Sequence, residues 1–114
     1  MDDAGRIDDM SRYASSEEAD ALAASNADVA EMNGASDKEE LLVRMGEALQ
    51  FPDYFGENWD AFDECLRELR SATLLIRDAA ALWTSMPAEM ITLVDVWSAA
   101  ARDSDEGLDL IFVL

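Results

Sequence analysis

The sequence contains no histidine and only one cysteine, Cys65. Without imidazole, and with a single thiol, the chain cannot supply the usual ligand sets for zinc. One cysteine also excludes a disulfide within the chain, and a thiol nucleophile would have no histidine as its base. Cys65 lies on the apolar edge of a predicted helix, so we expect it to be buried and unreactive.

Positive charge is scarce in this sequence. Eight Lys and Arg side chains stand against 26 Asp and Glu, which gives a formal net charge of −18. Such a surface repels nucleic acid and anionic membranes and attracts basic proteins, although it also serves solubility alone. No basic patch interleaved with aromatic residues is present, so direct binding of nucleic acid is not expected.

Glycine-rich loops and long apolar runs are missing as well. The five glycines are scattered and no Gly-Lys-Ser/Thr sequence occurs, which argues against a phosphate-binding loop. No apolar run approaches the roughly 18 residues that span a membrane, and residues 1–6 do not read as the start of a signal peptide. We therefore expect a cytoplasmic protein with no cofactor, no metal and no membrane partner.

The chain does have enough apolar residues for one domain, since 50% of its 114 residues are hydrophobic. Residues 1–27 differ from the rest because they are acidic and rich in Ala and Ser. We interpret them as a variable, partly disordered extension. Residues 15–24 have the composition of one short capped helix, but their large apolar side chains are too few to anchor it firmly. Removing residues 1–25 is accordingly expected to leave folding and function intact.

Residues 28–114 alternate between short apolar runs and helical stripes. Strands are predicted near 28–32, 72–76 and 108–113. Helices are predicted from a capping box at Ser36–Glu39 to Gln50, over 59–70, near 78–83, and over 87–101. This order implies right-handed crossovers. It predicts an α/β domain over 28–114 with a three-stranded parallel sheet and about four helices.

Two local features are predicted for the last helix. Ser85 is a possible cap, with Pro87 in the first turn. Ile91, Val94 and Trp97 recur at spacings of three, which predicts a buried stripe.

The stretch from Phe51 to Leu66 contains the functional signal. Pro52 ends the preceding helix, and Asn58 is a good N-cap for the helix over 59–70. On that helix the apolar side carries Trp59, Phe62, Leu66 and Leu69. The opposite side carries four charged residues, Asp60, Asp63, Glu64 and Arg67.

This charged side allows several interpretations. Asp60 and Glu64 are neighbours on the helix, where like charges cost about 0.2–0.5 kcal/mol, and Arg67 is a possible partner for Glu64. The acids could form a plain solvated face, a cation site or a glycosidase pair. A cation site here offers fewer oxygens than calcium prefers, and a glycosidase pair needs a cleft. Aromatic residues and a glycine just upstream also allow a surface that receives a cationic partner, whereas composition alone favours the plain solvated face.

The segment from Leu49 to Leu66, LQFPDYFGENWDAFDECL, resembles the inhibitory loop and helix of the barstar family. These are small intracellular bacterial proteins that inhibit a secreted ribonuclease. The Tyr-aromatic-Gly-x-Asn-x-Asp-Ala run, with Cys five residues after the Asp, carries the resemblance, and weaker similarity covers residues 28–114. The resemblance implies a barstar-like fold with a three-stranded parallel sheet.

The same resemblance identifies candidate partner-binding residues. Tyr54, Gly56, Asn58 and Asp60 match positions that line the nuclease contact. Glu64 stands where the best-known member has its dominant aspartate, and Asp63 stands where that member has a tryptophan. With Phe55, these residues complete the candidate site.

Two functions from different classes follow. The first is an intracellular inhibitor, or immunity protein, of a basic, barnase-like secreted ribonuclease. It would be a monomer when free and would block the active site with its acidic helix and adjoining loop. The second is a small acidic interaction module that binds a different basic protein. Neither is an enzyme.

Overall fold

The computed structural model of the chain describes residues 6–8, 11–25, 29–52, 58–69, 71–103 and 107–113, with side chains described from residue 11 onward. In chain order the elements are β1 (Arg6–Asp8), β2 (Ser11–Ala14), α1 (Ser16–Ser25), β3 (Val29–Met32), α2 (Lys38–Ala48), α3 (Trp59–Glu68), β4 (Ala72–Ile76), α4 (Ala79–Ser85), α5 (Pro87–Arg102) and β5 (Leu108–Val113). The four helices predicted for residues 28–114 correspond to α2, α3, α4 and α5.

A single sheet has the strand order β1-β2-β5-β4-β3. β3, β4 and β5 pair in parallel, with Met32 opposite Ile76 and Leu74 opposite Leu110. The α/β class, the three predicted strands and their parallel pairing are confirmed. The sheet is wider than predicted, because β2 adds a fourth parallel strand beside β5 and β1 pairs antiparallel with β2.

The segment before residue 26 pairs with and packs against the sheet, which its composition did not suggest. β2 lies along β5 with Ser11 opposite Leu110, and α1 follows directly. A capping box starts α1: the Ser15 hydroxyl accepts from the Glu18 amide at 3.1 Å, and the Glu18 carboxylate accepts from the Ser15 amide at 3.0 Å. The segment is joined to the sheet by backbone ladder bonds and by the small buried residues Ala14 and Ala19, since its large apolar side chains are few.

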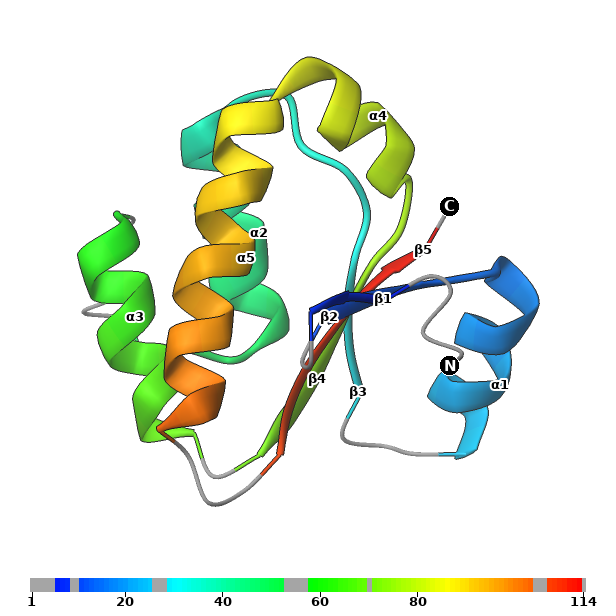
Figure 1. Cartoon of the computed structure of the whole chain (residues 1–114), viewed down its shortest axis with the longest axis horizontal. Helices are drawn as coiled ribbons and strands as arrows, with labels where there is room; N and C mark the ends of the chain where they lie inside the picture. The colour runs from blue at the N-terminus through cyan, green and yellow to red at the C-terminus, as the bar shows by residue number, and fades with distance from the viewer. Residues whose placement is uncertain are drawn as a thin grey trace.

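The two faces of the sheet carry two separate cores. Helices α2, α3, α4 and α5 lie on one side of the sheet and α1 on the other (Figure 1). The main core includes the fully buried Phe62, Trp97 and Phe112. On the opposite face Ala19 of α1 packs with Leu75 and with Ile111 and Val113 of β5. These parallel strands therefore have apolar cover on both faces, as parallel sheets generally do.

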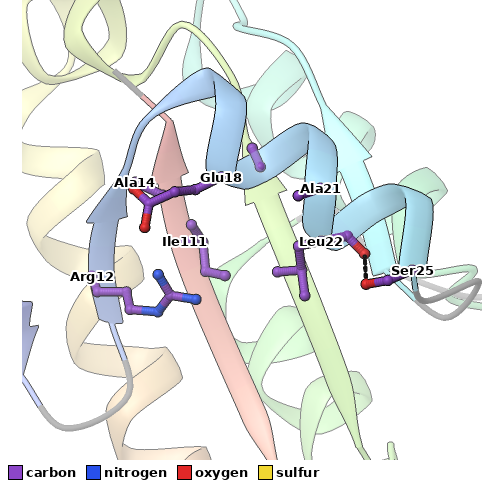
Figure 2. A pocket seen from close by; sticks show the side chains of 8 residues that line it. Arg12, Ala14, Glu18, Ala21, Leu22, Ser25 and Ile111 are labelled. Carbon is purple, nitrogen blue, oxygen red and sulfur yellow. Dashed lines mark hydrogen bonds between the residues drawn. The ribbon is translucent and has the colours of Figure 1, made fainter.

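The cover provided by α1 is incomplete. A pocket of about 350 Å³ lies between α1 and the sheet, and Figure 2 shows Arg12 of β2, Ile111 of β5 and Leu22 of α1 around it. The Arg77 guanidinium donates to Glu31 of β3 at 2.7 Å and to Asp20 of α1 at 2.9 Å. These hydrogen bonds, first that to Glu31, raise the pKa of Arg77. α1 is thus attached through its middle as well as through β2.

The start and end of α2 differ from the predicted ones by one or two residues. Asp37, not Ser36, is the N-cap, and its carboxylate accepts from the Glu40 amide at 2.8 Å. Glu40 in turn accepts from the Ser36 amide and hydroxyl, and hydrogen bonds from Ser36 and Arg44 lower its pKa to about 2. The helix ends at Ala48, because Gln50 adopts a left-handed φ of 59° before Pro52.

The predicted details of α5 are partly right. Pro87 occupies the first turn, but the cap position is Met86, whose side chain makes no capping bond. Ile91 is 55% exposed, so its place in the buried stripe was wrong. The buried side of α5 instead comprises Met90, Leu93, Val94, Trp97, Ser98, Ala100 and Ala101. In the part of the chain that the structure describes, no helix combines the length and apolarity needed to cross a membrane.

Candidate functional site

The site is built on α3, whose first turn is fixed by its N-cap. Asn58 has an extended backbone, and its side-chain oxygen accepts from the Ala61 amide at 2.8 Å. This bond satisfies one of the amides that a helix start leaves without a partner. The predicted cap is confirmed, and the Asn58 side chain is itself exposed.

The inner face of α3 packs on aromatic side chains. Phe62 is fully buried, and its ring centroid lies 5.6 Å from Trp59, 5.6 Å from Phe51 and 6.5 Å from Trp97. Leu66 is buried in the same cluster, and Trp59 is half-buried against it. The prediction that Trp59 and Phe62 point inward is confirmed. Because the inner face of α3 is held in the core, its opposite, outer face has a fixed orientation.

The outer face of α3 presents Asp60 and Glu64, both exposed. They are four residues apart, hence adjacent on the helix surface, and within the described residues neither forms an ion pair. α3 lies on the far side of α5 from the sheet (Figure 1), and the two acids lie on the side of α3 opposite its buried face. We refer to Asp60 and Glu64 as the acidic ridge. It can receive cationic groups without breaking any ion pair among the described residues.

Asp63 is arranged differently from the other two acids. Its carboxylate accepts from the Arg67 guanidinium at 2.8 Å, and Arg67 also pairs with Asp103, the C-cap of α5. The hydrogen bonds from Arg67 to Asp103 and then Asp63 raise the pKa of Arg67. The sequence suggested Arg67 as a partner of Glu64, and the structure gives it to Asp63 and Asp103 instead. Asp63 thus belongs to a surface ion network within the molecule, whereas Glu64 has no ion pair among the described residues.

The loop residues of the candidate site, Tyr54, Phe55 and Gly56, lie outside the described residues. The chain on either side of them is well anchored. Upstream, the Phe51 amide donates to the Gly46 carbonyl at 2.8 Å, and downstream Asn58 caps α3. Phe51 is thus bonded to α2 and packs against Phe62 of α3, and Asn58 is the N-cap of α3. The roles of these three residues stay predictions.

Cys65 lies on the buried edge of α3. It is a free thiol and only 5% exposed. Burial first, and then the charges of Glu68 and Glu64, raise the pKa of the thiol. A raised pKa lowers the fraction of reactive thiolate at a given pH, in agreement with the expected unreactive cysteine.

A labelling experiment tests this interpretation of Cys65. We expect a thiol reagent at neutral pH to label the folded protein at least about tenfold more slowly than the denatured protein, since both access and thiolate are reduced. The labelling rate would be followed by mass spectrometry with and without denaturant. Equal rates in both states would mean that Cys65 is accessible in the native fold.

Other kinds of site find little support. Among the residues that the structure describes, no group of three or more His, Cys, Asp or Glu side chains is placed to hold a metal ion. The pocket under α1 has Arg12 and Glu18 as its charged groups (Figure 2). Glu18 is already engaged in the cap of α1. The two acids of the ridge are on an exposed helix face, which does not enclose a substrate as a glycosidase pair would.

One contact of this region was missed at the sequence level. The indole Nε1 of Trp59 donates to a carboxylate oxygen of Glu89, in the first turn of α5, at 3.1 Å. The two residues are 30 positions apart, and no periodicity connects them. The only signal was chemical: a tryptophan at the edge of a core usually finds a partner for its N–H group.

The sequence of this region also matches a known protein family. The family model described as Barstar (barnase inhibitor) matches residues 26–114, which include α3 and all of the candidate site. A search of curated proteins finds no match to the sequence. Residues 1–25, with β2 and α1, precede the matched region.

Proposed function

The chain belongs to the barstar family, a family of inhibitors rather than enzymes, and from this premise we propose that it inhibits a basic, barnase-like secreted ribonuclease. We place this activity in the bacterial cytoplasm, where the protein would act as an immunity protein against the cell's own nuclease. The observation that carries the proposal is the exposed acidic ridge on a helix whose inner face is locked into the core.

The ridge suits an enzyme that binds phosphate. A ribonuclease active site holds the RNA backbone with basic side chains, because phosphate is negatively charged. The carboxylates of Asp60 and Glu64 can occupy those phosphate positions, and they offer no bond that the nuclease cleaves. Their mutual repulsion in the free protein would be relieved by the cations of the enzyme. This gain on binding favours the complex over the free inhibitor.

The overall charge supports the same partner. A net charge of −18 creates a long-range field that draws a basic protein toward the inhibitor. Electrostatic complementarity raises association rates and suppresses wrong partners, an effect whose measured examples include the barnase–barstar pair. Fast capture matters for an inhibitor that must act before the nuclease degrades RNA.

The test is direct inhibition of RNA cleavage. The purified protein would be titrated into a barnase-like ribonuclease and into an unrelated acidic-substrate hydrolase as a control. We expect stoichiometric loss of RNA cleavage and no effect on the control enzyme. Unchanged cleavage across several basic bacterial ribonucleases would contradict the proposal.

A second candidate is an interaction module for another basic protein. It is favoured by Asp63, which stands where the best-known family member has a tryptophan. Here the Asp63 carboxylate is paired with Arg67, which also pairs with Asp103. A pull-down from lysate and culture medium separates the two candidates. Recovery of a basic protein without nuclease activity, combined with no effect on RNA cleavage, would favour this second function.

A further inference from the structure

The first residue of α3 is hydrogen-bonded to a different helix. Trp59 Nε1 donates to Glu89 of α5 at 3.1 Å in a partly buried environment. Of the three tryptophans, all within the described part of the chain, Trp59 alone has this N–H group paired, since the buried indole N–H groups of Trp83 and Trp97 have no partner. The indole N–H on the helix of the acidic ridge therefore has a hydrogen-bond partner, whereas those of Trp83 and Trp97 have none.

The opposite end of α3 is tied to α5 as well. Arg67, in the last turn of α3, bridges to Asp103 at the C-terminal end of α5. The two helices run side by side in the same direction, and Phe62 and Trp97 pack between them (Figure 1). α3 has polar links at both ends and an apolar contact between them.

The link at Trp59 is the one that bears on the acidic ridge. Trp59 stands between Asn58 and Asp60 in the chain, and a turn at the start of a helix frays readily when its side chains are free. A hydrogen bond to a carboxylate is stronger than one to a neutral acceptor, and its loss leaves a half-buried donor without a partner. The bond to Glu89 thus restrains the orientation of the first turn of α3, and with it the side chains of Asn58 and Asp60.

We propose that Glu89 is a positioning residue for the partner-binding surface: by accepting from the Trp59 indole, it holds the first turn of α3 against α5 and aligns the acidic ridge before the partner arrives. This inference rests on the proposed function of that ridge. A rigid, aligned ridge binds more tightly because less conformational freedom is lost in the complex. Glu89 need not touch the partner for this effect.

Substitutions at both ends of the bond separate alignment from charge. Glu89→Gln removes the charge and keeps an oxygen acceptor, whereas Glu89→Ala removes both. Trp59→Phe keeps the ring and removes the donor. Asp95→Ala, at an exposed position elsewhere on α5, is the control for the loss of one negative charge.

Binding would be measured against a barnase-like ribonuclease. We expect Glu89→Ala and Trp59→Phe each to weaken binding about tenfold, mainly through faster dissociation, and Glu89→Gln to restore most of the loss. The double variant Trp59→Phe with Glu89→Ala should lose no more than either single variant, since both break the same bond. Asp95→Ala should change only the association rate. If Glu89→Gln, Glu89→Ala and Asp95→Ala changed the affinity equally, Glu89 would contribute only its negative charge, and the proposal would be overturned.

A measurement on the free protein keeps this test separate from the proposed function. Hydrogen exchange of the Ala61 and Phe62 amides reports the opening of the first turns of α3. We expect faster exchange there in Glu89→Ala and Trp59→Phe, at unchanged exchange in the β4 and β5 strands. If the parent protein binds no ribonuclease, the proposed function fails while faster exchange still supports the positioning role. Unchanged exchange in both variants would refute that role whatever the partner.

Discussion

Replacing Glu64 by alanine is expected to weaken the complex with a barnase-like ribonuclease by about 2–5 kcal/mol, mostly through faster dissociation. The range comes from buried charge pairs in complexes that include the barnase–barstar pair and is borrowed from them. Glu64 is exposed and forms no ion pair within the described residues, so its engagement by a partner breaks no ion pair among them. Its removal would leave cationic groups of the nuclease buried without a partner.

Glu17→Ala is a matched control for this experiment. It removes the same charge from an exposed position on α1, across the sheet from α3 (Figure 1). We expect it to lower the association rate slightly at low salt and to leave dissociation unchanged. Asp60→Ala should act in the same direction as Glu64→Ala, with a smaller effect, since the helix start already stabilises its charge. Rates at two ionic strengths distinguish these cases.

The folded state should tolerate Glu64→Ala, because the substitution removes a like-charge neighbour of Asp60. Thermal melts of the free variants check this. A folded Glu64→Ala protein that binds as tightly as the parent would show that the acidic ridge does not stand in for phosphate.

Features governed by local sequence were predictable. The Asn58 cap and the inward side of α3 follow from one residue type and from helical periodicity, and both are confirmed. The three predicted parallel strands followed from their apolar runs. Such signals are visible because the interacting residues are within a few positions of each other in the chain.

Features that depend on distant pairs were not predictable in this way. Periodicity says nothing of the contacts between Trp59 and Glu89 or between Arg67 and Asp103, which join separate helices. The strand β2 was also missed, because pairing along β5 is made by backbone groups that any sequence possesses. Ala19 is small, yet it is only 1% exposed, so α1 is held by close approach more than by apolar area.

The structure reverses the expectation for the N-terminal segment, so that deleting residues 1–25 is now expected to destabilise the fold strongly. The deletion removes α1 from Leu75, Ile111 and Val113, which are at most 3% exposed, and leaves the edge of β5 unpaired. Exposing side chains of this size costs about 1.5–3 kcal/mol each when complete. Since neighbouring strands still shield them in part, we expect a loss on the order of 5 kcal/mol, comparable to the whole stability of many small domains. Denaturant unfolding of both proteins would measure it.

A single substitution tests the same packing without shortening the chain. Ala19→Asp places a carboxylate between α1 and the sheet, whereas Ala21→Asp makes the same change two residues away at an exposed position. Both substitutions cause the same loss of helix propensity. The difference between their free energies of unfolding therefore reports the cost of burying the carboxylate. We expect Ala19→Asp to lose about 3 kcal/mol more than Ala21→Asp, because a carboxylate buried against Leu75 and Ile111 loses its hydration. Equal unfolding midpoints for the two variants, or a deletion variant as stable as the parent, would mean that α1 rests on the sheet without stabilising it. Inhibition by the fraction that stays folded should persist in every case, since the acidic ridge lies on the other side of the sheet.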